Sequence, residues 1–451
     1  MAIKHLGAAI WLSLTLTMAV AAEPTPSAPV AAGASAPVAG TVANAQFHIE
    51  PVDDAWRASL PRDADLATKA YMDRLPADIV TRSNAYFEGG YWLQLWNFLL
   101  GLLISVVLLG GKRSARVRDW AQRIGKKSFF RDALYGGYFA IASFVLTIPL
   151  TVYQGFVREH AYGMATQTFG PWLGEQMIGL GVSTVGTALA VGALYAVIRR
   201  AGKEWWLWGT ALTSVLLVLM IMVSPVLIDP LFNTYKPVED GPVKSAVLAM
   251  AKADGVPVDN IYEFDASRQT TRVSANVSGI FGSAAVRLND NLLRRTTLPE
   301  IRAVMGHELG HYVMNHVYKM IASFGLLLLA GFLFAKWGME KMLARYGARW
   351  SLQGVGDVAS LPLFAAVFSV FMFAATPIVN TIIRTQEIEA DRFGLNLARE
   401  PHGMAEAFLK LTEYRKPNPS AFEEFVFFDH PSTQFRVHDA MRWREAMGTT
   451  P

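Results

Sequence analysis

The pentapeptide His307-Glu308-Leu309-Gly310-His311 decides how this chain folds and what it can do. On an α-helix, residues four apart are separated by about 400° of rotation, so both imidazoles leave one face, one turn apart. They can share a zinc ion, while Glu308 takes a proton from an attacking water molecule. The simpler interpretation is two surface histidines on an ordinary helix. Because the chain has only nine histidines in 451 residues, this spacing favours zinc.

The residues before this motif favour a helix. Thr297 and Glu300 have the spacing of a capping box, and Pro299 falls in the first turn, where its missing N–H costs little. Gly306 and Gly310, four apart, allow either close approach of another helix or packing against a sheet.

Composition indicates a membrane protein. The chain is 52% hydrophobic and 17% charged, and its mean hydropathy is +0.26. A net charge of +4 gives no reason to expect a nucleic acid partner. The chain has no cysteine, so a zinc site must use histidine and carboxylate ligands.

The first 89 residues precede the membrane region. Residues 1–22 have Lys4 and His5 before an apolar stretch, which predicts a signal peptide cleaved near Ala22 or an uncleaved anchor helix. Residues 23–45 are rich in alanine and proline and predict a disordered linker. Residues 46–89 are mixed and predict an extramembrane segment with short helices.

Six apolar segments have about the 20 residues that a membrane-spanning helix needs. One such segment could be a buried core helix, but six together predict a multi-pass membrane protein. Four fall within 90–228 and two within 320–383, which leaves 229–319 and 384–451 as the two parts of a catalytic domain. The segments are 91–110, 134–153, 177–198, 205–228, 320–338 and 361–383.

Loop charges predict the orientation. The connection 112–131 carries eight basic residues against one acid, Asp119, whereas 154–176 has Arg158 as its only lysine or arginine. The connections after the third and fifth segments are also basic. By the positive-inside rule the basic loops are cytoplasmic, so the histidine motif faces the other side, the periplasm in a bacterium.

The segment 229–319 predicts a small α+β unit, with a helix near 242–254. Strands are expected at 261–264, 272–277 and 284–288, the last because Arg287 alternates with apolar neighbours. The motif helix runs without proline into the fifth apolar segment, which predicts a metal close to the membrane surface or within the helical bundle. His316 lies about 140° off the face of His311 on that helix, and we interpret it as a packing or hydrogen-bonding residue.

A catalytic zinc needs three protein ligands and an open position. After the sixth segment, Glu387 and Asp391 lie four apart, so Glu387 can be the third ligand and Asp391 can accept the N–H of a ligand histidine. The acids could instead simply favour a helix start, and spacing alone does not rank Glu387 above Glu389.

With these motifs in hand, the chain resembles the type I CAAX prenyl endopeptidases, a gluzincin family of membrane zinc metallopeptidases, over about 90–445. HELGH followed by E-x-x-x-D carries the resemblance. Supporting motifs are Asp229–Asn233, Ser274-Ala275-Asn276, His430-Pro431 with Arg436, and Glu159 with Gly163.

The resemblance implies a mostly α fold: a polytopic helical membrane barrel around a water-filled chamber, with a small α+β zincin-type metallopeptidase domain. It places the third ligand of one zinc per chain at Glu387, beside His307 and His311, with Glu308 as the catalytic base. It also implies substrate binding by an edge strand and by two late residues, namely Ser274, Ala275, Asn276, Val277, His430 and Arg436.

The substrate class follows less directly. The family's eukaryotic members have seven membrane helices and act on the cytosolic face, whereas loop charges put this site outside. Membrane-associated or exported peptides therefore fit better than prenylated proteins, and the expected partners are a peptide or protein substrate and membrane lipid. The sequence does not indicate an oligomeric state.

Several alternatives stay open. Within the enzyme class, a quality-control protease competes with a substrate-specific processing protease. A non-catalytic, zinc-stabilised chamber that binds apolar peptides is disfavoured by Glu308, since structural zinc needs no base beside it. A transporter is disfavoured because the sequence shows no internal repeat. An intramembrane protease of another zinc class is disfavoured by the polar turn before the motif.

Overall fold

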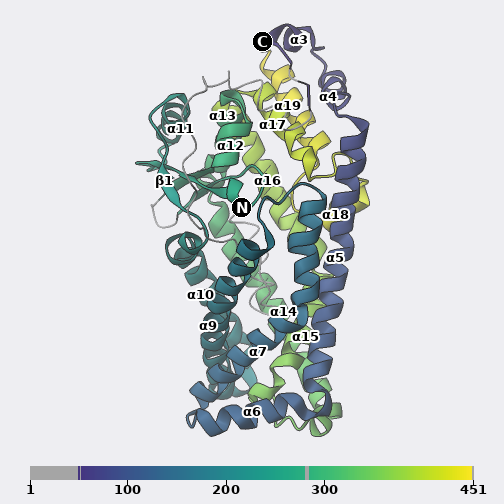
Figure 1. Cartoon of the computed structure of the whole chain (residues 1–451), viewed down its shortest axis with the longest axis vertical. Helices are drawn as coiled ribbons and strands as arrows, with labels where there is room; N and C mark the ends of the chain where they lie inside the picture. The colour runs from purple at the N-terminus through teal and green to yellow at the C-terminus, as the bar shows by residue number, and fades with distance from the viewer. Residues whose placement is uncertain (1–48, 51, 280–283, 449–451) are drawn as a thin grey trace.

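The computed structural model describes residues 49–50, 52–279 and 284–448. The predicted signal peptide (1–22) and linker (23–45) lie outside the described residues. Long helices run along the molecule, one helix crosses their lower end, and a small sheet with shorter helices lies at the upper end (Figure 1).

The six predicted apolar segments all fall on long helices. In chain order these helices are α5 (Ala77–Leu109), α7 (Ser128–Val152), α9 (Phe169–Ala201), α10 (Trp205–Val223), α14 (His316–Trp350), α15 (Leu361–Ala374) and α16 (Thr376–Ala398).

The structure gives up to five possible membrane crossings where the sequence predicted six, because two of the predicted helices are joined into one stretch. Four stretches of the described residues are long and apolar enough to cross a membrane, and the bent pair α15–α16 makes a fifth. One stretch, Phe169–Leu231, contains both α9 and α10, which pack against each other on either side of a turn at Gly202 (φ 55°). Counted separately, these two helices restore the predicted six.

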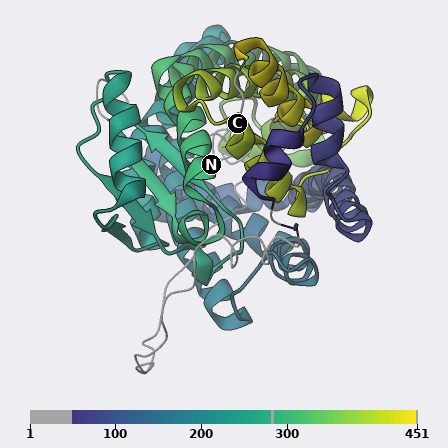
Figure 2. The same cartoon turned by 90° about the horizontal axis from the view of Figure 1, so that it is seen from above.

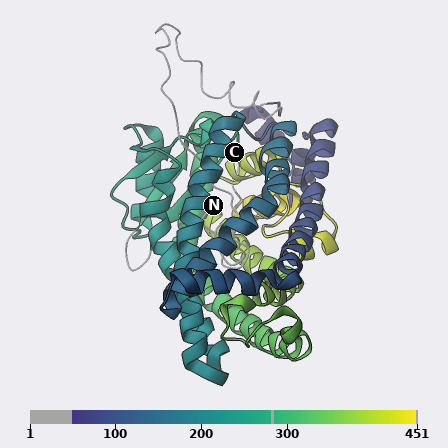
Figure 3. The same ribbon diagram turned by 60° about the horizontal axis from the view of Figure 1, so that its bottom comes forward.

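Two details of the membrane region differ from the sequence-based expectation. The sixth segment is a bent pair of helices, with an angle of 55° at a break next to Ala375. The basic connection 112–131, expected to be a loop, contains helix α6 (Arg113–Ile124), which runs across the end of the bundle (Figure 3).

The long helices are incompletely buried. Even in the most apolar part of each candidate membrane stretch, at most 28% of residues are buried. A cluster of aromatic rings is buried where α10, α14 and α15 meet, formed by Trp205, Phe332, Phe364 and Phe368. Apolar helices with this much free surface are suited to form a wall rather than a solid bundle.

The sheet has four short strands in the order β1-β2-β4-β3: β1 (Tyr235–Pro237), β2 (Ile261–Phe264), β3 (Ala275–Ser278) and β4 (Ala285–Asn289). β2 and β4 are parallel, whereas the outer pairs are antiparallel. The three predicted strands are present with small shifts at their ends, and the three-residue β1 was not predicted. One face packs onto α11 (Pro242–Ala253) and α13 (Leu298–Val313) through Val247, Ile261, Val286, Leu288 and Met305.

Helix α13 carries the histidine motif and ends earlier than expected. Asn315 has φ 57°, a left-handed conformation that asparagine adopts more readily than most residues. The helix is therefore interrupted, and α14 begins at His316. The continuous helix from the motif into the fifth membrane segment was a wrong expectation.

The remaining helices enclose α13 from the side away from the sheet. Helix α4 (Ala64–Met72) packs against α17 (Pro401–Lys410) and α19 (Thr433–Met447) through a core that includes Tyr71, Met404 and Met441. Seen from above, α11 and the sheet lie on one side, and α4 with α3 (Asp54–Ser59) lies on the other (Figure 2). The residues before α5 thus join the C-terminal part of the chain.

Candidate metal centre

The start of α13 is fixed by the predicted capping box. The backbone N–H of Thr297 donates to the Glu300 carboxylate at 3.0 Å, and the same carboxylate pairs with the buried Lys410 at 2.7 Å. Because helix start and phase are set together, the side chains at positions 307 and 311 have a defined direction.

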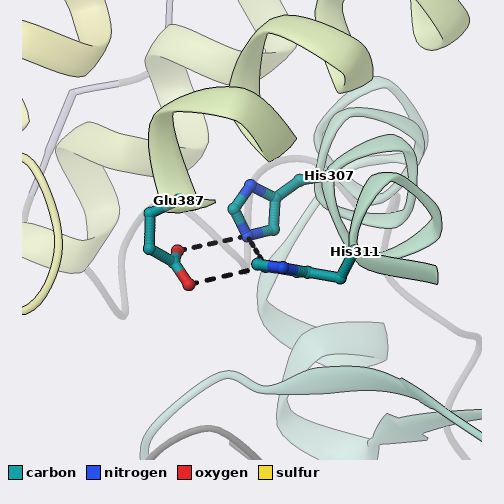
Figure 4. A group of neighbouring side chains, drawn as sticks. All are labelled: His307, His311 and Glu387. Carbon is teal, nitrogen blue, oxygen red and sulfur yellow. Dashed lines mark hydrogen bonds and ion pairs between the residues drawn. The ribbon is translucent and has the colours of Figure 1, made fainter. Parts of the chain in front are cut away.

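His307, His311 and Glu387 converge on one point (Figure 4). The two Nε2 atoms lie 3.1 Å apart. His307 Nε2 is 3.4 Å from Glu387 Oε2, and His311 Nε2 is 3.4 Å from Glu387 Oε1. All three side chains are buried, and one donor atom from each lies within 4.8 Å of the others. The three residues predicted as ligands are therefore brought together by two different helices.

Glycines allow the two helices to meet at this distance. A Cβ on Gly394 of α16 would lie 2.7 Å from the backbone nitrogen of His307, and one on Gly306 would lie 3.0 Å from the carbonyl oxygen of Gly394. A Cβ on Gly310 would meet the ring of Phe393 at 3.1 Å. Gly306 and Gly310 thus face α16 and not the sheet, which decides between their two interpretations.

The donor set fits a metal ion. Glu387 Oε2 is buried, and among the described residues no hydrogen bond of good geometry reaches it, although His430 Nε2 lies 3.2 Å and His307 Nε2 3.4 Å away. A buried carboxylate oxygen without a hydrogen bond is costly unless a cation satisfies it. Two imidazoles and one carboxylate are a set that zinc accepts in catalytic sites.

His307 is oriented from behind by an anion. Its Nδ1 lies 2.8 Å from Asp391 Oδ1, and Asp391 receives two hydrogen bonds from Arg436, at 2.7 and 2.5 Å. Burial disfavours the charged imidazole, but the neighbouring carboxylates of Asp391 and Glu387 outweigh it and raise the pKa of His307 to about 10. The field of these carboxylates favours a cation here, so a metal ion must displace a proton.

Arg436 thus has a different contact from the one expected. It was predicted to hold substrate, yet its guanidinium is 6% exposed and lies on the ring of Phe408 while it bonds Asp391. In this position it orients the carboxylate that orients His307.

His311 is oriented by a neutral group that sequence reasoning did not connect with the site. Its Nδ1 lies 2.8 Å from His316 Nδ1. His316 Nε2 lies 3.1 Å from Glu389 Oε2, and Lys319 pairs with the same oxygen at 2.6 Å. The helix break at Asn315 turns His316 back towards His311. The asparagine itself was the local sequence signal of that break.

Glu308 and His430 flank the convergence point. Glu308 is half-buried, and burial raises its pKa, although His307 acts against this shift. His430 Nε2 lies 3.2 Å from Glu387 Oε2, and its Nδ1 lies 2.8 Å from Asp429 Oδ1. Burial lowers the pKa of His430, with Glu387 opposing, which favours a neutral ring.

The predicted substrate strand lies beside the metal helix. β3 contains Ala275, Asn276 and Val277, stands at the edge of the sheet and contacts α13. Ser274 precedes it and is tied to Asn289 through two hydrogen bonds of 3.0 and 2.9 Å.

A cavity of about 280 Å³ lies next to His430. Glu159, from the E-x-x-x-G motif, is close to its wall and accepts hydrogen bonds from Tyr86 at 2.7 Å and Arg272 at 2.6 Å. The lining includes Tyr86, Tyr91, Arg158, Arg272, Tyr414 and His430. His430 thus lines this cavity, and Glu159 contacts two of its lining side chains.

Comparisons with known proteins agree with this arrangement. Residues 237–444 match the family model of peptidase family M48. Residues 60–234 match a model described as the CAAX prenyl protease N-terminal region with five membrane helices. The membrane part and the metal-binding part of the chain are therefore both covered.

Individual relatives span most of the chain. A Bacillus subtilis protein named uncharacterized metalloprotease YhfN is 31% identical over 346 residues, covering 76% of this chain and 81% of that protein. A CAAX prenyl protease 1 homolog of Dictyostelium discoideum is 27% identical, over 62% of this chain and 66% of that protein.

The crystal structure of S. mikatae Ste24p is similar with a TM-score of 0.71 and 19% identity. The match covers 89% of this chain and 97% of that chain. This likeness confirms the predicted fold, a mostly helical membrane chamber with a small sheet-containing domain.

Proposed function

Since the chain belongs to peptidase family M48 and is a multi-pass membrane metalloprotease, we propose that it is a zinc endopeptidase that cleaves membrane-associated or exported peptides. The observation that carries this proposal is the convergence of His307 Nε2, His311 Nε2 and the Glu387 carboxylate within 4.8 Å, with Glu308 on the same helix.

In this proposal His307, His311 and Glu387 hold one zinc ion. When bound, zinc supplies a Lewis acid that polarises the scissile carbonyl and lowers the pKa of a water molecule from about 15.7 towards about 7. Glu308 takes the proton of the attacking water and passes it to the leaving amine. Its raised pKa suits this task, because a carboxyl group poised nearer neutrality both accepts and returns a proton.

The residues around the metal position would place the peptide. An extended substrate adds to the outer edge of β3, the last strand of the described sheet, through backbone hydrogen bonds, with Ser274 to Val277 as the pairing residues. The Nε2 atom of His430 lies 3.2 Å from Glu387 Oε2, and in its protonated form this ring can donate a hydrogen bond to the oxyanion that develops on the carbonyl. Asp391 and His316 hold the two ligand imidazoles in the orientation that directs both Nε2 atoms to one point.

The test compares the peptides that accumulate in cells carrying the wild-type chain and the Glu308→Gln variant. Removal of the base should abolish cleavage while stoichiometric zinc remains, because the three ligands are intact. Glu239→Gln, which removes an exposed carboxylate from a loop outside the site, is the matched control and should behave as wild type.

The outcome also separates the candidate functions. Defined C-terminal peptides produced only by the wild type support a processing protease, and scattered internal cuts support quality control. If the Glu308→Gln variant retains full turnover with zinc bound, the chain is not this enzyme, and a zinc-stabilised chamber that binds apolar peptides becomes the better description.

A further inference from the structure

Helix α6 crosses the end of the molecule remote from the sheet (Figures 1 and 3). It follows α5 after two residues in the left-handed conformation, Gly111 (φ 57°) and Lys112 (φ 60°), which turn the chain. After Ile124 only three residues separate it from α7. Because α6 joins two membrane helices at the same end and runs across them, it lies at the level where they leave the bilayer.

One face of α6 is anchored to the protein. Ser114, Ala115, Arg118 and Ala121 are buried. Arg118 forms a 2.6 Å ion pair with the buried Asp357, and the Ser114 hydroxyl donates to a backbone carbonyl in the same connection. This face cannot turn outward, which fixes the direction of the opposite face.

The outer face combines positive charge with exposed apolar side chains. At about 100° per residue, its residues fall in one stripe roughly 100° wide. Trp120 is 48% exposed and Ile124 is 57% exposed, and Phe130 at the start of α7 continues the apolar surface at 57%. The stripe consists of Arg113, Arg116, Trp120, Arg123 and Ile124.

The charge of this surface is not neutralised. Of the acids nearby, Asp119 bonds Arg118 at 2.8 Å, and Asp132 is buried between Arg131 and Arg199. Among the residues that the structure describes, no carboxylate pairs with the remaining basic side chains, which are Lys112, Arg113, Arg116, Arg123, Lys126 and Lys127.

We propose that α6 and the turn 125–127 bind the headgroups of anionic phospholipids, with Trp120, Ile124 and Phe130 set into the boundary between headgroups and acyl chains. A helix with cationic residues beside tryptophan and aliphatic residues lies flat in this boundary. Lysine and arginine next to a membrane helix are attracted to anionic lipid, and their long side chains reach the headgroups.

Position and composition favour lipid over a macromolecular partner. The surface is continuous with α5 and α7, so lipid is already next to it. A nucleic acid or acidic protein would satisfy the charges but not Trp120, Ile124 and Phe130, which point outward from the same surface. Bilayer lipid satisfies both.

The experiment uses the purified full chain in nanodiscs of phosphatidylcholine with increasing fractions of phosphatidylglycerol. The readouts are the apparent affinity for phosphatidylglycerol and the rise in the thermal unfolding midpoint. The triple variant Arg116→Gln, Arg123→Gln, Lys126→Gln should bind phosphatidylglycerol at least about tenfold more weakly, since each basic residue near an anionic surface contributes up to about fivefold. Raised salt should reduce the wild-type affinity.

The matched control removes three exposed basic residues from the far end of the molecule: Arg62→Gln, Lys252→Gln, Arg442→Gln. This variant should retain the wild-type affinity. Equal losses in the two triples would mean that only net charge matters and would overturn the proposal, as would full phosphatidylglycerol binding by the α6 triple. Trp120→Gln leaves the charge unchanged and should still weaken binding; unchanged affinity would contradict insertion.

Discussion

His311 and His316 are joined through their Nδ1 atoms at 2.8 Å, and this contact fixes the tautomers of both rings. A metal ion would be bound through the lone pair of His311 Nε2, so in the metal-bound site the ring hydrogen lies on Nδ1 and is donated to His316. His316 then carries its own hydrogen on Nε2, 3.1 Å from Glu389. His307 has a charged counterpart in Asp391, so the two ligands are held by partners of different charge.

Replacing His316 should therefore weaken metal binding without touching a ligand. We expect His316→Leu to lower zinc affinity about 10- to 100-fold, the usual cost of losing such a partner. His316→Asn, whose side-chain oxygen can accept the same hydrogen bond, should recover most of it. Chelator competition on the purified protein measures both, and His438→Asn at an exposed ion pair serves as control. Equal affinities for the Leu and Asn variants would contradict this role.

Glu387 and Glu389 can be separated by their metal content. Glu387 is 2% exposed and lies 3.4 Å from both ligand imidazoles, whereas Glu389 is half-exposed and paired with Lys319. Elemental analysis should find no stoichiometric zinc in Glu387→Ala and close to one zinc per chain in Glu389→Ala. Loss of zinc from the Glu389 variant alone would reverse the assignment.

Adding a methyl group between the two metal-binding helices should disturb the site. In Gly394→Ala the new Cβ would meet the backbone nitrogen of His307 at 2.7 Å, so α13 and α16 must move apart. Overpacking of this kind costs about 1–3 kcal/mol. We expect a lower thermal unfolding midpoint together with weaker zinc binding. Gly174→Ala, whose Cβ meets nothing within 4 Å, should show neither change.

Acid should loosen the attachment of α4. Tyr71 OH and His402 Nδ1 lie 2.7 Å apart, and burial, with Arg444 and Arg57 adding, lowers the pKa of His402 from 6.5 to about 4. Between these pH values His402 on α17 binds a proton when α4 is detached but not when α4 is docked. The stability of the docked state therefore falls as pH drops from 6.5 towards 4. The protection of Ala64–Met72 against hydrogen exchange, relative to the intrinsic rate at each pH, should fall over this range, and the fall should shrink in His402→Gln. Protection that does not change with pH in the wild type would contradict the prediction.

The orientation in the membrane can be read with a reporter. The basic helix α6 and the last helix, α19, lie at opposite ends of the molecule (Figure 1), and the positive-inside rule puts α6 in the cytoplasm. A C-terminal fusion to a reporter that is active only in the cytoplasm should be silent, and one fused after Gly125 should be active. The reverse pattern would place the metal site on the cytoplasmic side.

Local signals in the sequence were sufficient for the parts that depend on local physics. The capping box at Thr297 and the spacing of His307 and His311 predicted the start of α13 and the direction of the ligands. Apolar length predicted the long helices, and alternation around Arg287 predicted β4. Asp391 was expected behind a ligand histidine because an imidazole on a metal needs an acceptor for its other N–H.

Other features depend on single backbone conformations or on distant contacts. The left-handed Asn315 redirects His316, and the helix pair bends at Ala375, two residues before Pro377 in the first turn of α16. Arg436 reaches Asp391 across 45 residues, and its alternative contact with substrate fitted the sequence equally well. The positive charge of 112–131 was evident from the sequence. That this stretch contains a helix lying across the bundle depends on contacts of its buried face with distant residues, which the sequence does not show.

Three glycines determine the spacing between the helix that carries the two histidine ligands and the helices packed against it. Gly306 and Gly394 bring the backbones of α13 and α16 into contact, and Gly403 does the same for the start of α13, where a Cβ would lie 2.6 Å from the carbonyl oxygen of Pro299. The backbone contacts at these glycines thus set the distance between the metal-binding side chains. A site for a larger ion could be designed by substituting these glycines, which would widen the helix spacing while every coordinating side chain is kept.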